Sequence, residues 1–275
     1  MTADGWTIGD ADVVVVVGSM RTGTTLVAEL LDSHPDVTYL GFELSEEWSD
    51  WTGLPWGAPG ADDVSCPPVG VAEATPERIA AARDGVTRLL RDAAPTDPDA
   101  RPGTVVLKNP HVWHRLPFLC AVLPGARVVR TRRDRRATVA SLRRLWDRAL
   151  DQHGRVHHLP EDPDRCWDFV PAADAGAYDP LRTFPGGDVG VLAEFHRRVE
   201  RCLDRFADDH PGRIVAEVAQ EDLVRDFAAT TSGLLAALDL PPASLVPPEP
   251  LDPDRLDEWR DLLTQDEQER IGTVG

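Results

Sequence analysis

One segment constrains the fold of this chain most strongly, because an apolar run, a glycine-containing turn and a helical pattern follow one another in it. The run from Asp12 to Val17 is rich in β-branched residues, which is typical of a buried parallel strand. The turn GSMRTGTT, residues 18–25, comes next, and apolar residues then recur at helical spacing until His34 and Pro35. A strand, turn and helix in this order direct backbone N–H groups and the helix dipole at one point. The segment therefore predicts an anion-binding turn.

The rest of the chain alternates in the same way between apolar runs and helical patterns. Strands are predicted at 104–107, 126–131 and 213–218, and helices at 76–94, from 110 to about 123, from about 134 onward and at 189–208. This alternation predicts an α/β fold with three layers, in which helices cover both faces of a parallel sheet. We expect a single domain over residues 1–275, with irregular insertions near 44–75 and 151–188, where Pro, Gly, Trp or Asp accumulate.

The bulk composition excludes several classes of protein. A net charge of -18 argues against a nucleic-acid partner, which needs a basic surface. The apolar run at 13–17 is too short to span a membrane or to act as a signal core. The four cysteines are scattered without a CxxC pair, and the histidines at 153, 157 and 158 lack a paired carboxylate pattern. We therefore expect reduced thiols, no metal site and a cytoplasmic location.

The turn has the glycine spacing of a nucleotide-binding P-loop but lacks its lysine. Gly18 and Gly23 are followed by Thr24 and Thr25, where a P-loop carries Lys and then Ser or Thr, and the cation is Arg21 instead. Neither of the other two candidate strand ends offers an Asp to help hold magnesium. The turn is thus built for an anion other than Mg-ATP, the alternative being a plain turn without a ligand.

A second basic segment follows the third predicted strand. Between Arg127 and Arg148 the chain has nine arginines against two aspartates, although the protein is strongly acidic. Self-repulsion opposes such a cluster, so a bound polyanion would explain it. Pairing of Arg143, Arg144 and Arg148 with surface carboxylates is the alternative explanation.

The stretch GSMRTGTTLVAELLDSHPD, residues 18–36, resembles the 5'-phosphosulfate loop of sulfotransferases that use 3'-phosphoadenosine 5'-phosphosulfate (PAPS). It is most similar to the branch that contains the tyrosylprotein sulfotransferases and related bacterial enzymes. The resemblance implies that Arg21, Thr24 and Thr25 contact the 5'-phosphosulfate. The donor-binding residues expected from this loop are Ser19, Arg21, Thr22, Gly23, Thr24 and Thr25.

A second resemblance lies in the basic segment. RDRRATVAS, residues 133–141, is similar to the motif RDGRASVHS, which binds the 3'-phosphate in that family. Arg133 at a strand end and Ser141 eight residues later can converge on one phosphate, as a charged fork and a hydroxyl donor. Arg135 replaces the Gly of the motif, so the turn before the helix is expected to differ. The stretch QEDLV, residues 220–224, is similar to the family's YEDLV, with Gln in place of Tyr.

Candidate catalytic groups follow from the chemistry of sulfuryl transfer, which needs a base on the acceptor and a cation where charge develops. Lys108 is the only lysine beside 28 arginines, and it ends the second predicted strand, in LKNPH. Glu43 stands close to the position of the catalytic Glu in the similar enzymes, and Glu46 is the fallback. His111 is the other candidate base, because small-molecule sulfotransferases use a His just after the corresponding Lys. The catalytic set is therefore Glu43, Lys108, Arg21 and His111.

These features predict a PAPS-dependent sulfotransferase that releases PAP (3'-phosphoadenosine 5'-phosphate) and needs no metal. The acceptor is expected to be a hydroxyl of a small metabolite, a glycolipid or a natural product. A peptidyl-tyrosine sulfotransferase is the alternative within the family, and a P-loop kinase or NTPase is the alternative from another class. The sequence identifies neither the acceptor nor the oligomeric state.

Overall fold

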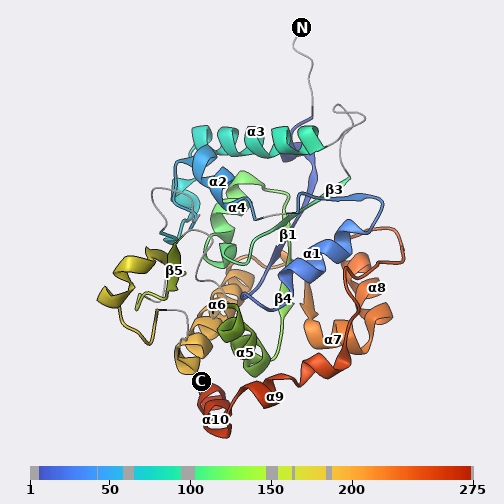
Figure 1. Cartoon of the computed structure of the whole chain (residues 1–275). Helices are drawn as coiled ribbons and strands as arrows, with labels where there is room; N and C mark the ends of the chain where they lie inside the picture. Colours follow the sequence, from blue (N-terminus) through green and yellow to red (C-terminus); the bar gives the residue numbers. More distant parts are fainter. Residues whose placement is uncertain are drawn as a thin grey trace.

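A computed structural model describes residues 6–41, 43–57, 65–93, 103–146, 154–162, 165–183 and 188–273 of the chain. Its centre is a sheet of five parallel strands in the order β2-β3-β1-β4-β7 (Figure 1). The strands are β1 (Asp12–Val17), β2 (Val37–Tyr39), β3 (Thr104–Lys108), β4 (Arg127–Arg132) and β7 (Ile214–Ala219). The glycine-containing turn thus follows the central strand, and β3 and β4 are the two strands that flank it.

The apolar run of β1 is continuous because both of its faces are covered. Val13, Val15 and Val17 belong to one hydrophobic core, and Val14 and Val16 belong to the other. Successive side chains of a strand point to opposite faces, so an unbroken valine run suits a strand between two layers of helices.

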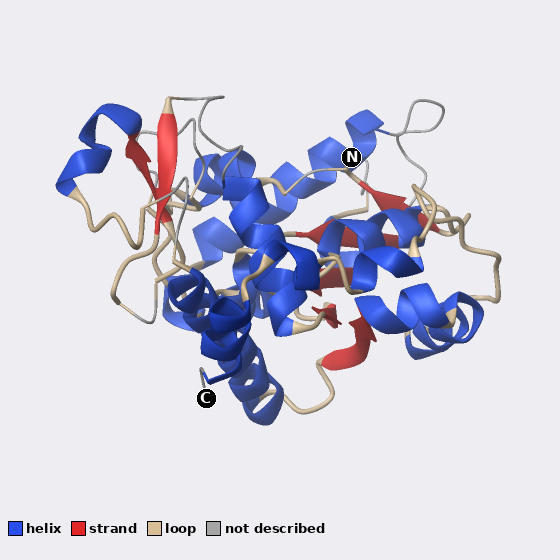
Figure 2. Cartoon of the chain, turned by 60° about the horizontal axis from the view of Figure 1, so that its bottom comes forward, coloured by secondary structure: helices blue, strands red, loops and turns tan. Residues whose placement is uncertain are grey.

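Helices form the two outer layers (Figure 2). The first core contains side chains of α3, α4, α5 and α6, and the second contains side chains of α1, α7 and α8. The helices are α1 (Thr24–Asp32), α2 (Ser45–Thr52), α3 (Pro76–Ala93), α4 (Leu116–Val122), α5 (Arg135–Trp146), α6 (Val189–Asp209), α7 (Gln220–Arg225), α8 (Phe227–Ala237), α9 (Trp259–Leu262) and α10 (Gln265–Thr273). The predicted three-layer α/β class with a parallel sheet is confirmed. Among the described residues, no helix is both long and apolar enough to cross a membrane.

The two segments expected to be irregular contain regular elements in their described parts. Segment 44–75 begins with α2, because Trp48 and Trp51 pack onto the hydrophobic core beside α3. Segment 151–188 contains an antiparallel pair, β5 (Arg155–His158) with β6 (Asp168–Pro171). These elements are only four to eight residues long. The Pro, Gly and Asp content of both segments predicted irregular structure in their place. The short edge strand β2 was missed for the same reason.

Candidate active site

The turn between β1 and α1 depends on two glycines. A Cβ on Gly18 would lie 2.2 Å from Thr131 Oγ1 of β4, so the turn can approach this strand only without a side chain. Gly23, just before α1, has φ of +92°, which is the left-handed region that favours glycine. Arg21 also has a positive φ, of +67°. The turn is therefore held in a conformation that a generic sequence would not adopt.

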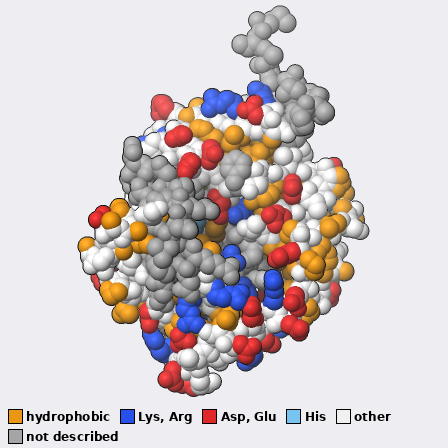
Figure 3. Space-filling view, viewed as in Figure 1, with side chains coloured by type: hydrophobic (Ala, Val, Ile, Leu, Met, Phe, Trp, Pro, Cys, Tyr) orange, Lys and Arg blue, Asp and Glu red, His pale blue; other side chains and the backbone are white. Residues whose placement is uncertain are grey.

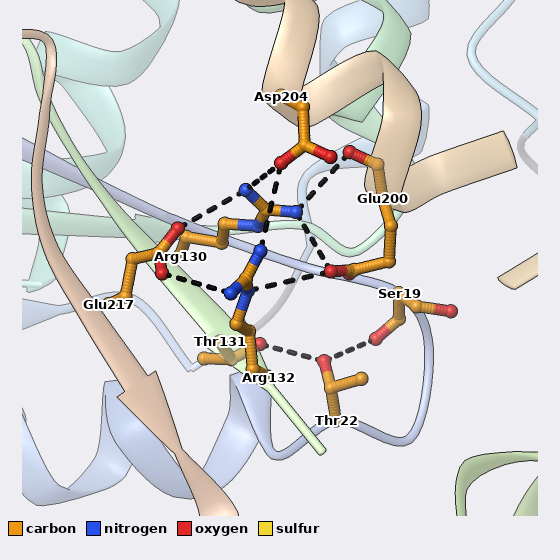
Figure 4. A network of polar contacts seen from close by, with 8 residues as sticks. All are labelled: Ser19, Thr22, Arg130, Thr131, Arg132, Glu200, Asp204 and Glu217. Carbon is orange, nitrogen blue, oxygen red and sulfur yellow. Dashed lines mark hydrogen bonds and ion pairs between the residues drawn. The ribbon is translucent and has the colours of Figure 1, made fainter. Parts of the chain in front are cut away.

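Two of the predicted donor ligands, Ser19 and Thr22, lie inside the turn and contact each other. The Thr22 hydroxyl donates to the Ser19 carbonyl over 2.6 Å and lies 2.8 Å from Thr131 Oγ1 (Figure 4). Ser19 and Thr22 are both buried, at 0% and 1% exposure. The Thr22 side chain thus stabilises the turn from inside, whereas Ser19 Oγ is buried without a hydrogen-bond partner among the described residues.

A pocket of about 320 Å³ opens over the other residues of the turn. It is lined by Arg21, Gly23, Thr24 and Thr25 of the turn, by Arg133 and Gln220, and by the acidic Glu29 and Glu249. Arg133 Nε and Gln220 Oε1 are buried there without a hydrogen-bond partner. Two arginines and two hydroxyls suit an anion, and the unpartnered polar atoms leave hydrogen bonds for a ligand to complete. The sequence did not predict that Gln220, Glu29 and Glu249 line this pocket, because its lining residues lie up to about 230 positions apart in the sequence.

The two predicted phosphate motifs meet at this pocket. Arg133 Nη1 donates to the Arg21 carbonyl over 3.2 Å, and Arg21 Nε donates to Ser141 Oγ over 3.1 Å. Arg21 belongs to the turn after β1, whereas Arg133 lies between β4 and α5 and Ser141 lies within α5. Since β1 and β4 are neighbours, these side chains come together at one edge of the sheet. The Arg21 guanidinium thus lies between the two motifs.

Most of the other arginines in the basic segment are neutralised by carboxylates from distant elements. Arg130 contacts Glu200, Asp204 and Glu217 at 2.7–3.1 Å, and Arg132 contacts the same three carboxylates at 3.3–3.6 Å (Figure 4). Arg143 pairs with Glu267, and Arg144 with Glu258. Figure 3 shows this mixture, with basic side chains beside acidic ones in the lower middle of the face. Ion pairing therefore explains much of the cluster, and Arg148 lies outside the described residues.

The third group lies at the end of β3. Lys108 Nζ donates to Glu43 Oε1 over 2.8 Å, and His111 Nε2 lies 3.6 Å from Glu43 Oε2. Lys108 is paired in register with Val16 of β1, two residues before the turn. Glu43 is 37% exposed, whereas the side chain of Lys108 is 7% exposed. The predicted cation and both leading candidate bases thus form one cluster beside the turn, while Glu46 is exposed on α2.

Asn109 positions this cluster, a role that the sequence analysis did not assign. Its Nδ2 donates to the Glu43 carbonyl over 3.0 Å, and its Oδ1 accepts from the His111 backbone N–H over 2.8 Å. One side chain therefore links the loop of Glu43 to the segment of His111. Its place directly after the strand-ending Lys108 is the only signal in the sequence that could have indicated it.

The charges in the cluster favour an ionised carboxylate. Burial by itself raises the pKa of Glu43, but the neighbouring His111 and Lys108 outweigh it and lower that pKa. Burial lowers the pKa of His111, and the Glu43 charge offsets this only in part. At neutral pH we therefore take His111 as uncharged and Lys108 as the cation that keeps Glu43 ionised.

A layer of aromatic side chains backs His111. Its ring lies 4.2 Å from that of Trp167, which in turn lies 5.4 Å from the ring of His157 in β5. Burial lowers the pKa of His157 to about 4. Within the described ranges, no group of three or more His, Cys, Asp or Glu side chains could hold a metal ion. His153 lies outside these ranges.

The sequence also matches known proteins. The profile of the sulfotransferase family matches residues 13–244. The nodulation protein NoeE of Sinorhizobium fredii is 32% identical over 140 residues, which are 48% of this chain and 31% of NoeE. The chain thus matches about a third of the length of this curated relative.

Solved structures show the same fold at low sequence identity. The sulfotransferase domain of the Synechococcus PCC 7002 olefin synthase has a TM-score of 0.52 at 17% identity, covering 98% of this chain and 97% of that domain. The sulfotransferase domain from the curacin biosynthetic pathway has a TM-score of 0.52 at 14% identity, with 96% of both chains covered. Sulfotransferase STF9 from Mycobacterium avium has a TM-score of 0.51 at 15% identity, over 93% of this chain and 69% of STF9. With the family match over most of its length, this chain belongs to the sulfotransferase family.

Proposed function

We propose that this chain is a PAPS-dependent sulfotransferase, which acts on a hydroxyl of a small metabolite, a glycolipid or a natural product. The observation that carries the proposal is the convergence of Arg21, Arg133 and Ser141, since it links two anion-binding motifs at neighbouring strand ends. A nucleotide with phosphate groups on both its 3' and 5' sides suits two such motifs better than ATP does. PAPS would supply the sulfuryl group, and PAP would be the product released.

The donor would be held by the turn and by the start of α5. In this proposal Arg21, Thr24 and Thr25, with the backbone N–H groups of the turn, bind the 5' side, and the dipole of α1 adds to the attraction. Arg133 and Ser141 bind the 3'-phosphate. Ser19, Thr22 and Gly23 keep the turn in shape through the contacts described above.

The acceptor would be activated at the end of β3. Glu43 is the proposed base, because the cluster keeps it ionised and it is exposed enough to be reached by an acceptor hydroxyl. Lys108 uses one of its three N–H donors on Glu43, so two remain for oxygens on which charge develops. His111 is the alternative base, since its ring is uncharged and touches Glu43. A single domain in the cytoplasm, with Cys66, Cys120, Cys166 and Cys202 reduced, completes the proposal. Among the described residues these cysteines form no disulfide.

Donor selectivity tests this proposal without knowledge of the acceptor. Calorimetric titration in the absence of magnesium should show that PAP binds about ten- to a hundredfold more tightly than AMP, because the 3'-phosphate adds charge-assisted hydrogen bonds. Arg133→Gln should remove most of that preference. The matched control, Arg144→Gln, removes an exposed arginine of α5, the helix that follows Arg133, and should preserve the preference. Equal affinity for AMP and PAP in the native protein, or magnesium-dependent ATP hydrolysis, would refute the proposal.

A further inference from the structure

A second basic pocket lies between α6 and the short 3₁₀ helix Val112–His114. Its volume is about 340 Å³, and its lining includes Trp113, His114, Arg198, Arg201, Cys202 and Arg205. It shares no lining residue with the pocket over the turn. We refer to it below as the arginine pocket.

The spacing of its arginines places them on one face of α6. Positions 198, 201 and 205 are separated by three and four residues, which are neighbours on a helix surface. Like charges at this spacing repel one another, so an acidic protein would be expected to place carboxylates among them. Among the described residues, no carboxylate lines the pocket. The face of α6 that carries Glu200 and Asp204 is already occupied by Arg130 and Arg132.

Within the part of the chain that the structure describes, Glu194 is the one carboxylate that pairs with these arginines. Glu194 lies 3.5 Å from Arg198 and 3.6 Å from Arg201, and it also binds Arg197 at 2.6 Å. Among the described residues, Arg205 makes no ion pair and is exposed. The pocket therefore retains a positive charge in a protein whose net charge is -18.

The three arginines differ in burial and in how firmly their guanidinium groups are held by hydrogen bonds. Arg198 is buried and donates to the carbonyls of Pro160 and Asp162, so its guanidinium is fixed. Arg201 is 50% exposed, and with Arg205 it is free to turn toward a ligand. A fixed cation with two adjustable ones is an arrangement that can surround an oxyanion with bidentate hydrogen bonds.

The two aromatic lining residues each have a buried nitrogen that lacks a hydrogen-bond partner among the described residues. Trp113 is 2% exposed and His114 is 8% exposed, and Trp113 Nε1 and His114 Nδ1 have no hydrogen-bond partner. Buried polar atoms without a partner are rare in proteins and often indicate an absent water or ligand. This observation does not involve the arginines.

We infer that the arginine pocket is a second anion-binding site, which takes the phosphate group of a small phosphomonoester. Phosphate fits better than sulfate, because a phosphomonoester is close to a dianion at neutral pH whereas a sulfate monoester carries one charge. The apolar ring of Trp113 beside the arginines suits a ligand whose organic part is apolar or aromatic. This site does not depend on the proposed donor site.

Phenyl phosphate is a suitable probe for this inference. Titration calorimetry should detect its binding to the native protein, and the double variant Arg201→Gln/Arg205→Gln should weaken that binding by about tenfold or more. The matched control is Arg88→Gln/Arg225→Gln, which removes the same charge from exposed helix positions outside the pocket. This control and Arg133→Gln, which alters the proposed donor site, should bind phenyl phosphate as the native protein does. Phenyl sulfate should bind more weakly.

The outcomes separate this inference from the proposed function. The inference fails if phenyl phosphate does not bind, if the two double variants lose affinity equally, or if inorganic phosphate binds as tightly as the ester. It also fails if Arg133→Gln alone abolishes binding, because the probe would then occupy the donor pocket. PAP binding in the same variants reports on the donor site independently.

Discussion

At the end of β3, residue identity matters most at Lys108, the single lysine of the chain. Lys108 is buried at the end of β3 and contacts Glu43, in a chain that uses 28 arginines elsewhere. An ammonium is a compact point charge on a flexible stem, whereas a guanidinium is a planar fork. The two cations are therefore not equivalent at a position that must contact both a carboxylate and a reacting oxygen.

Substitution of Lys108 tests this difference. Lys108→Ala should reduce sulfuryl transfer by about 10²- to 10³-fold, since a donor to developing charge is lost. Lys108→Arg should recover little of that rate although it retains the charge, and both variants should bind PAP nearly as well as the native protein. The measurement is PAP release from PAPS with an acceptor found by a labelled-PAPS screen. A native rate in Lys108→Arg would mean that any cation suffices.

The protonation of Glu43 can be measured without an acceptor. Its pKa is lowered although burial opposes this, because His111 and the Lys108 cation together outweigh burial. Lys108→Met removes that cation, so the pKa of Glu43 should rise above its native value, and carboxyl-carbon NMR should follow the change. The carboxyl resonance of Glu46, which is exposed on α2, is the reference signal in both proteins. An unchanged Glu43 titration would show that Lys108 does not control its charge.

At the scale of elements, one aspartate begins the longest helix and joins it to the last one. Asp188 Oδ1 accepts from the backbone N–H groups of Gly190 and Val191, and Arg270 of α10 lies 2.7 Å from its Oδ2. Burial opposes ionisation of Asp188, but the Arg270 hydrogen bond and the two amides lower its pKa overall. The ionised form is thus the one that stabilises the fold.

Asp188→Ala should lower the free energy of unfolding by about 1 kcal/mol at neutral pH, which is typical of a lost helix cap. Because the folded-state pKa is lowered, this stabilisation is present above the ordinary aspartate pKa and is lost as pH falls through the folded value. Urea unfolding should therefore show the two proteins converging below about pH 4. Asp188→Asn retains the helix cap, so its free energy of unfolding should fall less than that of the alanine variant. A difference independent of pH would show that the charge contributes nothing.

At the scale of the whole molecule, Arg130 connects three elements that are far apart in the sequence. Arg130 is a residue of β4, and its guanidinium contacts carboxylates of α6 and β7 (Figure 4). Arg130 is 2% exposed, whereas Arg132, with the same partners, is 43% exposed. Removal of a buried member of an ion pair leaves the charges that it neutralised uncompensated. When the removed member is exposed, screening by solvent reduces the loss of stability.

Arg130→Met should therefore destabilise the protein by about 2 to 3 kcal/mol, at the low end for a buried pair because Asp204 and Glu217 are half-exposed. Arg132→Met is the matched control, and its loss should be below about 1 kcal/mol. Chemical denaturation of both variants measures the difference. Equal losses would mean that burial of Arg130 adds nothing to its ion pairs.

Much of the fold could be predicted because strands and helices are encoded locally. Helix α3 and strands β3, β4 and β7 lie within one or two residues of their predicted bounds, since periodicity and Pro76 define them. β2, α2 and the β5–β6 pair were not predicted, because elements this short show little periodicity and depend on their neighbours. The single-domain organisation stays a prediction.

By itself the sequence determined which groups meet at the edge of the sheet. Carboxyl ends of parallel strands come to one edge, so the turn after β1, Lys108 after β3 and Arg133 after β4 had to converge once the strands were identified. Only the tertiary structure decided which charges are compensated. Glu200, Asp204 and Glu217 reach Arg130 across 70 to 87 residues, and Glu43 meets Lys108 across 65. Such pairs depend on how α6, β7 and the loop before α2 pack against the sheet, and local sequence patterns carry no information about that packing.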